Sequence, residues 1–177
     1  MKTVSASLRA RLKKVRFLLL DVDGVLTDGR IIYDGNGVDA RFYDVQDGLG
    51  VYLLGRMGIK TVIVTAKASP SLKPRARDMR VEAVFENILP KTRAYAKILK
   101  KYRLRDEDVC FMGDDLLDLA VMRRAGVSAA PRQAADDIKR AADYVTRKEG
   151  GRGAVREVVE LILKCKGLWH RALKIYE

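Results

Sequence analysis

Two groups of aspartates, each directly after an apolar run of strand length, are the residues in this sequence best suited to chemistry. Asp21 and Asp23 follow the apolar run at 15–20. In an extended segment alternate side chains point the same way, so we expect these two carboxylates to face one place. Facing carboxylates repel unless a cation or a shared proton offsets their charge. The structural alternative is an ordinary turn after a strand, where Asp-Gly is common.

A second group of aspartates could bind a cation together with the first. Asp114, Asp115 and Asp118 again follow an apolar run. Magnesium prefers oxygen ligands in octahedral geometry and keeps several of its waters. We therefore predict a Mg²⁺ site held by Asp21, the Asp23 carbonyl and Asp114, with Asp115 binding through water and Asp118 bracing the turn. Helix capping is the alternative, and it accounts for one of the later acids more easily than for three.

Two further polar residues complete a phosphate site. Thr65 ends an apolar run, and its hydroxyl could donate to a phosphoryl oxygen; capping of a helix or turn is the alternative. Lys91 follows Pro90 at the start of a predicted helix and could neutralise both a phosphate and a nucleophile. A lysine at that position can equally be plain solvated surface. Together these residues supply a nucleophile, a proton carrier, a cation and phosphate ligands.

The elements that must position these residues alternate along the chain. Short apolar runs predict strands at 15–20, 60–65, 81–85, 109–112 and 126–130, with an edge strand at 144–146. Helical patterns occupy 7–14, 49–57, 72–79, 92–102, 116–125 and 134–142. This alternation predicts an α/β fold with a doubly wound, mostly parallel sheet, which binds ligands at the carboxyl ends of its strands.

One insertion interrupts the alternation after the first strand. The segments 30–33 and 39–43 flank Asp34-Gly35-Asn36-Gly37, which is a hairpin signal. We predict a β-hairpin over about 30–43 that projects from the carboxyl end of the first strand. The whole chain, 1–177, is predicted to form one domain, with a C-terminal helix and tail over about 151–177.

Composition narrows the class of protein. The formal charge is +12, yet the basic residues are dispersed and form no nucleic-acid-binding motif. No stretch approaches the ~20 apolar residues that a membrane span needs. Cys110 and Cys165 lack metal-ligand spacing and are expected to be buried, reduced thiols. His170 is the single histidine, which argues against a histidine-based site. We expect a cytoplasmic enzyme with a small anionic substrate, without nucleic-acid or membrane partners.

The motifs, in this order, resemble the haloacid dehalogenase superfamily of phosphatases. They are Asp-x-Asp-Gly-Val-x-Thr from residue 21, a threonine at the second strand end, a lysine before a helix, and Gly-Asp-Asp-x-x-Asp from residue 113. The resemblance implies that Asp21 attacks phosphorus, and that Asp23 protonates the leaving group and then activates water. It also implies that Thr65 and Lys91 hold phosphoryl oxygens and that Asp114 anchors Mg²⁺.

A narrower resemblance points to the subgroup of 3-deoxy-D-manno-octulosonate 8-phosphate phosphatases. Segments 21–29, 42–50, 113–118, 143–146 and 150–157 carry it, and the similarity spans about 12–163. These enzymes lack a cap domain and form homotetramers in which neighbouring subunits help to close each site. The resemblance implies a sugar acid phosphate substrate, whose carboxylate could be met by the guanidinium of Arg152 or by a basic side chain of a neighbouring subunit.

The chain departs from the family pattern beside the phosphate site. Thr65-Ala66-Lys67 stands where the family usually has Thr-Gly-Arg, so Ala66 and Lys67 are expected to meet the substrate with a different surface. Residues 68–75, with two prolines, also differ. Three alternatives therefore stay open: a phosphatase for a nonulosonate 9-phosphate, a nucleic-acid-end phosphatase, and a binding module that keeps the fold without turnover.

Overall fold

A six-stranded parallel sheet forms the centre of the protein. The structure, a computed structural model, describes residues 4–33, 35 and 39–177. The strand order is β5-β4-β1-β6-β7-β8, and every neighbouring pair is parallel. The strands are β1 (Phe17–Leu20), β4 (Lys60–Val64), β5 (Ala83–Phe85), β6 (Val109–Met112), β7 (Val127–Ala130) and β8 (Tyr144–Val145). The predicted doubly wound α/β fold is confirmed.

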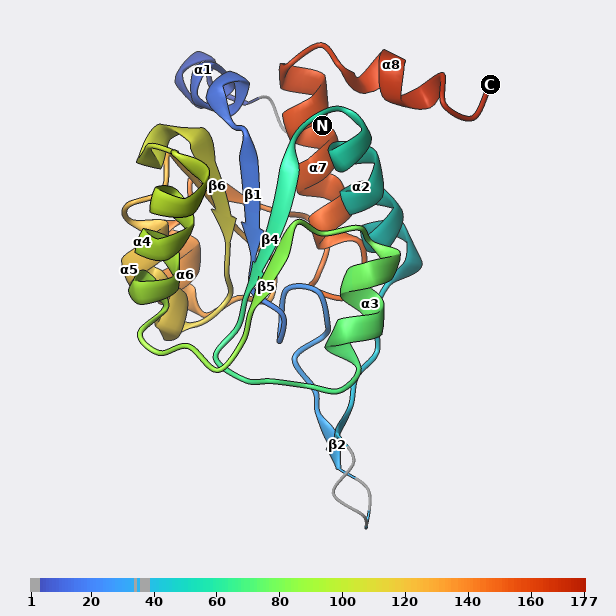
Figure 1. Cartoon of the computed structure of the whole chain (residues 1–177). Helices are drawn as coiled ribbons and strands as arrows, with labels where there is room; N and C mark the ends of the chain where they lie inside the picture. Colours follow the sequence, from blue (N-terminus) through green and yellow to red (C-terminus); the bar gives the residue numbers. More distant parts are fainter. Residues whose placement is uncertain (1–3, 34, 36–38) are drawn as a thin grey trace.

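Alternation along the central strand divides the core into two layers. Leu18 and Leu20 face one apolar cluster, while Phe17 and Leu19 face the other. Both faces are covered, which explains why this strand is a continuous apolar run. One layer contains α1 (Ala6–Lys14), α2 (Val45–Arg56), α3 (Leu72–Asp78) and α7 (Ala154–Cys165), and the other contains α4 (Lys91–Tyr102), α5 (Leu119–Met122) and α6 (Asp136–Ala141) (Figure 1).

Two helices differ most from their predicted bounds, for identifiable reasons. Helix α2 begins four residues before the predicted start, because the Asp44 side chain caps it by accepting the Asp47 N–H at 3.1 Å. The predicted helix at 116–125 is instead a 3₁₀ turn, η2 (Leu116–Asp118), followed by the short α5. The Asp118 carboxylate accepts the Asp114 N–H at 3.1 Å, which tightens this turn.

The hairpin projects below the carboxyl ends of the strands (Figure 1). Its strands, β2 (Ile32–Tyr33) and β3 (Asp39–Ala40), pair antiparallel, as predicted. Apart from Gly35, the predicted turn at 34–37 lies outside the described residues. Both cysteines are buried and free, as expected. Among the described residues, every helix is too short or too polar to cross a bilayer.

A buried carboxylate joins the C-terminal helix to the helix after the hairpin. Asp47 of α2 is fully buried and accepts the backbone N–H groups of Gly153 at 3.2 Å and Arg156 at 2.7 Å, at the start of α7. Helix N-termini leave backbone N–H groups without intrahelical partners. Asp47 therefore fixes where α7 begins; the final helix, α8 (Trp169–Leu173), follows α7.

Replacement of Asp47 by alanine should destabilise the protein substantially. It leaves two buried N–H groups without acceptors, which should lower the free energy of unfolding by about 2–4 kcal/mol. Urea denaturation measures this loss. The exposed Asp137→Ala breaks only a surface ion pair with Arg140 and should cost less than about 1 kcal/mol. Equal losses in the two variants would contradict the role of Asp47.

Candidate active site

Adjacent strands bring the two predicted aspartate groups together. Strands β1 and β6 are in register, with Leu20 opposite Met112, and the Asp21 N–H donates to the Met112 carbonyl at 3.1 Å. Asp21 thus leaves the sheet beside the segment that carries Asp114. The Asp114 carboxylate packs against Gly24, where a Cβ would lie 2.0 Å from Oδ2, and Gly24 has φ +80°. Glycine is required there for both reasons.

Lys91 is buried between two of these aspartates. Its Nζ lies 2.8 Å from Asp21 Oδ1 and 2.6 Å from Asp118 Oδ1, and its side chain is 1% exposed. The solvent-exposed alternative for this lysine is therefore wrong. Burial opposes the charge of Lys91, but the two carboxylates outweigh it and raise its pKa. The ammonium stays charged beside Asp21.

Three carboxylates lie close together in this cluster, and one ammonium contacts two of them. Oxygens of Asp21, Asp114 and Asp118 lie within 4.8 Å of one another. Burial, followed by the charge of Asp118, raises the pKa of Asp21 to about 7, against the effect of Lys91. Burial and the charge of Asp21 raise the pKa of Asp114 to about 7 as well. A divalent cation with hard oxygen ligands matches this surplus of negative charge.

The cluster differs in one member from the predicted ligand set. Asp118 joins Asp21 and Asp114, and it also holds Lys91 and the Asp114 N–H, which agrees with its predicted bracing position. Asp115 is exposed, lines the same cavity and caps η2 by accepting the Leu116 N–H at 2.7 Å. Its predicted contact through water stays a prediction.

The carboxylate of Asp23 faces an arginine of the hairpin. Arg41 Nε lies 2.6 Å from Asp23 Oδ1, and Nη2 lies 3.2 Å from Oδ2. The Arg41 side chain is 1% exposed. Sequence reasoning missed Arg41, whose only signal is a charged residue beside the apolar Phe42 in the returning hairpin segment.

The predicted phosphate residues line one cavity with the aspartates. This cavity, of about 300 Å³, is bounded by Asp21, Asp23, Gly29, Thr65, Ala66, Lys67, Lys91, Asp114, Asp115, Leu117 and Asp118. The Thr65 hydroxyl bonds the backbone N–H and carbonyl of Lys67, at 3.2 and 3.1 Å. The Lys67 ammonium contacts Asp39 at 3.4 Å and the Tyr33 hydroxyl. The turn after β4 is therefore tied to the hairpin.

Arg152 is the one predicted site residue that this chain does not bring to the cavity. Its side chain is 62% exposed, and Glu149 Oε2 lies 4.0 Å away. Its neighbours Gly150 and Gly151 are close to the site instead. They pack on the backbone of the turn after β1, where an added Cβ would approach the Gly24 carbonyl to 1.8 Å and the Asp28 nitrogen to 2.6 Å.

A glutamine that the sequence did not predict as a site residue also supports the turn after β1. Gln133 donates to the Gly24 carbonyl at 2.7 Å and accepts the Gly150 N–H at 2.9 Å. The Gly151 N–H donates to the Val25 carbonyl at 3.1 Å. A glutamine in a polar loop has no distinguishing pattern, so its role follows only from the tertiary contacts.

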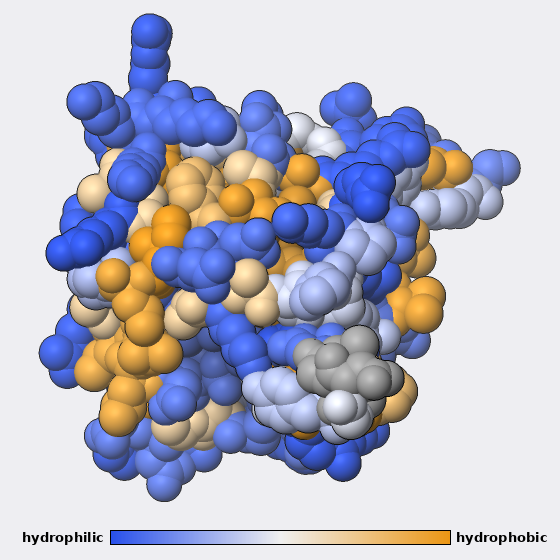
Figure 2. All heavy atoms as spheres, turned by 60° about the horizontal axis from the view of Figure 1, so that its bottom comes forward, coloured by the Kyte–Doolittle hydropathy of each residue, from blue (hydrophilic) through white to orange (hydrophobic). Residues whose placement is uncertain are grey.

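The view onto the hairpin side of the molecule shows hydrophobic residues gathered between hydrophilic ones (Figure 2). Large apolar side chains exposed near the cavity include Leu116 and Leu117, at 60% and 53%.

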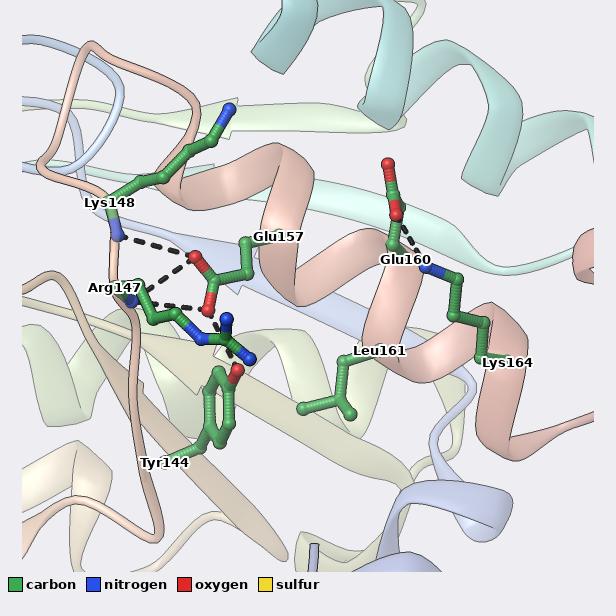
Figure 3. A pocket seen from close by; sticks show the side chains of 7 residues that line it. All are labelled: Tyr144, Arg147, Lys148, Glu157, Glu160, Leu161 and Lys164. Carbon is green, nitrogen blue, oxygen red and sulfur yellow. Dashed lines mark hydrogen bonds and ion pairs between the residues drawn. The ribbon is translucent and has the colours of Figure 1, made fainter. Parts of the chain in front are cut away.

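A separate hollow over α7 contains charged residues as well (Figure 3). There Glu157 accepts the Tyr144 hydroxyl at 2.7 Å and the Arg147 N–H at 3.1 Å. Two glutamates and three basic residues line that hollow, so it lacks the surplus of negative charge that marks the aspartate cluster.

Comparisons with known proteins agree with this geometry. Residues 75–158 match the family model of haloacid dehalogenase-like hydrolases. The chain is 37% identical over 164 residues to KdsC of Escherichia coli, a 3-deoxy-D-manno-octulosonate 8-phosphate phosphatase, with 93% of this chain and 87% of the relative covered.

Solved structures extend the match to three dimensions. The phosphatase of the same name from Yersinia pestis superposes with a TM-score of 0.92 at 35% identity, covering 94% of this chain and 90% of that one. The enzyme from Moraxella catarrhalis, solved with magnesium, phosphate and KDO, gives a TM-score of 0.93 at 33% identity, covering 96% and 98%. The chain therefore belongs to the 3-deoxy-D-manno-octulosonate 8-phosphate phosphatase family of haloacid dehalogenase-like hydrolases.

Magnesium should stabilise the protein through the aspartate cluster. At 100 times its dissociation constant, a ligand specific for the folded state adds about 2.7 kcal/mol to the free energy of unfolding. In Asp114→Asn the same magnesium concentration should add less than half of this, as measured by urea denaturation. Without magnesium the variant should be at least as stable as the parent, since it relieves repulsion in the cluster.

The control variant Asp137→Asn, on the exposed face of α6, should retain the full magnesium effect. An undiminished gain in Asp114→Asn would place the metal elsewhere.

Proposed function

We propose that this protein is a magnesium-dependent phosphatase that hydrolyses 3-deoxy-D-manno-octulosonate 8-phosphate through an aspartyl phosphate on Asp21. The supporting observation is the buried contact of Asp21 with Lys91 next to Asp114 and Asp118. Such a cluster presents one carboxylate oxygen to an incoming phosphate and compensates the charge around it. Similarity to KdsC over most of the chain supports the choice of substrate.

In the first half-reaction a carboxylate oxygen of Asp21 attacks phosphorus. The bond from phosphorus to the sugar oxygen breaks, its electron pair stays on that oxygen, and Asp23 supplies the proton. Lys91 holds a phosphoryl oxygen, the Thr65 hydroxyl turns from the Lys67 carbonyl to donate to another, and the backbone of Ala66 and Lys67 borders the phosphate. Preorganised charge of this kind is usually the largest contribution to catalysis.

In the second half-reaction water attacks the aspartyl phosphate. Asp23 takes the proton of the water as the bond between phosphorus and Asp21 breaks, which restores the Asp21 carboxylate and releases inorganic phosphate. Bound Mg²⁺, held by Asp21, Asp114 and the Asp23 carbonyl, would supply positive charge against the phosphoryl oxygens. Asp118 keeps Lys91 directed at Asp21.

The chain acts in the cytoplasm as one domain in a homotetramer, where a basic side chain of a neighbouring subunit, or Arg152, meets the carboxylate of the sugar acid. The charge of +12 favours capture of a substrate that carries both a carboxylate and a phosphate. The exposed apolar residues of the hairpin, Ile32 at 46% and Tyr33 at 63%, suit a surface that other subunits cover.

A nonulosonate 9-phosphate is the second candidate substrate. The observation that favours it is the turn after β4, where Lys67 is directed to Asp39 and Tyr33 of the hairpin. An arginine in the usual family position could bind an anionic group in a bidentate manner, whereas a lysine cannot. The space beside this turn is where the two sugars would be distinguished.

The nucleophile is tested by Asp21→Asn. An amide cannot replace the carboxylate as attacking group, so turnover should fall by at least about 10³-fold, a loss of about 4 kcal/mol in transition-state stabilisation. Phosphate release with Mg²⁺ measures it, and phosphorylated protein, trapped by acid quench, should be present only in the parent. Normal turnover in the variant would remove Asp21 from this role.

The substrate is tested with a panel of sugar phosphates and magnesium. We expect the highest kcat/KM for 3-deoxy-D-manno-octulosonate 8-phosphate, at least tenfold above a hexose 6-phosphate, because the hexose lacks the carboxylate. A higher value for a nonulosonate 9-phosphate would select the second candidate. Binding without magnesium-dependent phosphate release from any member would contradict enzymatic function.

A further inference from the structure

The guanidinium of Arg41 is an unusually buried charge for a residue of a projecting hairpin. Its side chain is 1% exposed and lies between Asp23 and Asp39. Two parallel contacts, at 2.6 and 3.2 Å, engage both oxygens of Asp23. A fork of this type fixes the plane and direction of a carboxylate, which a single contact does not.

A second carboxylate holds Arg41 in place. Asp39 bonds Arg41 Nη1, accepts the Ser69 hydroxyl at 2.8 Å and contacts Lys67 at 3.4 Å. Burial works against the charge of Asp39, but Ser69, Arg41 and Lys67 together lower its pKa. Asp39 therefore remains an anion that anchors the guanidinium. Through Ser69 and Lys67, Asp39 also links the turn after β4 to Arg41.

We propose that Arg41, anchored by Asp39, is a positioning residue that sets the direction of the Asp23 carboxyl group for both proton transfers: Oδ1 stays on Nε, while Oδ2, which has the longer contact, carries and receives the proton. This inference rests on the proposed function. Asp23 is 28% exposed and extends from a turn rather than from a rigid strand, so its rotamer needs an external constraint. The hairpin supplies that constraint, in addition to any contact it makes between subunits.

The role of Asp23 predicts for which substrates kcat/KM should fall when Arg41 is replaced. A sugar alkoxide leaves only when Asp23 protonates it as the bond to phosphorus breaks. Nitrophenolate is a stable anion and leaves without a proton. For nitrophenyl phosphate, kcat/KM covers only the steps through loss of nitrophenolate, whereas kcat also covers hydrolysis of the aspartyl phosphate, which needs Asp23 to take a proton from water.

The test compares Arg41→Gln on two probes, 3-deoxy-D-manno-octulosonate 8-phosphate and 4-nitrophenyl phosphate, in the intact protein with Mg²⁺. For the sugar phosphate, kcat/KM should fall by about 10–100-fold, part of the 10²–10⁴-fold that proton transfer supplies. For nitrophenyl phosphate, kcat/KM should change less than about threefold, while kcat falls and a burst of nitrophenolate precedes the steady state. Asp23→Asn should show the same pattern more strongly.

Arg41→Lys tests the fork itself and serves if Arg41→Gln does not fold. It keeps the charge and loses the second parallel contact, so it should recover part of the lost rate. The control is Arg105→Gln. Arg105 forms an exposed ion pair with Glu107 just before β6, at the amino ends of the strands and so away from the cavity. This control should leave both substrates unaffected.

Two results would overturn the positioning role. Equal losses of kcat/KM on the two substrates would indicate a general effect on structure or binding, and unchanged rates in Arg41→Gln would show that Asp23 needs no guide. Either result, obtained with an active parent enzyme, leaves the proposed function intact. An inactive parent with both probes would instead refute the proposed function, and the positioning role with it.

Discussion

The clustering of three aspartates, two of which contact one buried lysine, is the constraint on which the rest of the structure depends. Like charges in a poorly solvated place repel, and removing one partner of a buried ion pair is costly. Lys91 relieves part of this repulsion through Asp21 and Asp118, and Asp114 stays within reach of both carboxylates. The arrangement persists because strong packing around it fixes the groups, and it is completed by a divalent cation.

The packing that resists this repulsion is supplied by the two central strands. Every residue of β1 and β6 is buried, and alternate side chains enter separate apolar layers on the two faces. In a close-packed core, neighbouring strands cannot shift relative to one another without losing contacts on both faces. The carboxyl ends of β1 and β6 therefore present their aspartates at a fixed separation.

The sheet and the aspartates at the carboxyl ends of its strands could be predicted, because both are marked by local patterns in the sequence. Apolar runs marked the strands; Asp21 directly follows one, and Asp114 follows another after Gly113. The first turn of α2 and the 3₁₀ turn before α5 were missed, since both depend on side-chain caps. Arg41 and Gln133 were missed for a different reason. Their partners lie 18 and 109 residues away, and no short-range pattern indicates such contacts.

The glycine pair at 150 and 151 has a consequence for how this protein tolerates change. There the segment before α7 meets the turn after β1 as bare backbone, with no side chain between them. Any larger residue at Gly150 would displace Gly24, against which the Asp114 carboxylate packs. In a randomised library these two positions should remain invariant among active clones, although neither contributes a functional group. The segment before α7 therefore limits the shape of the turn after β1, more than a hundred residues earlier in the chain.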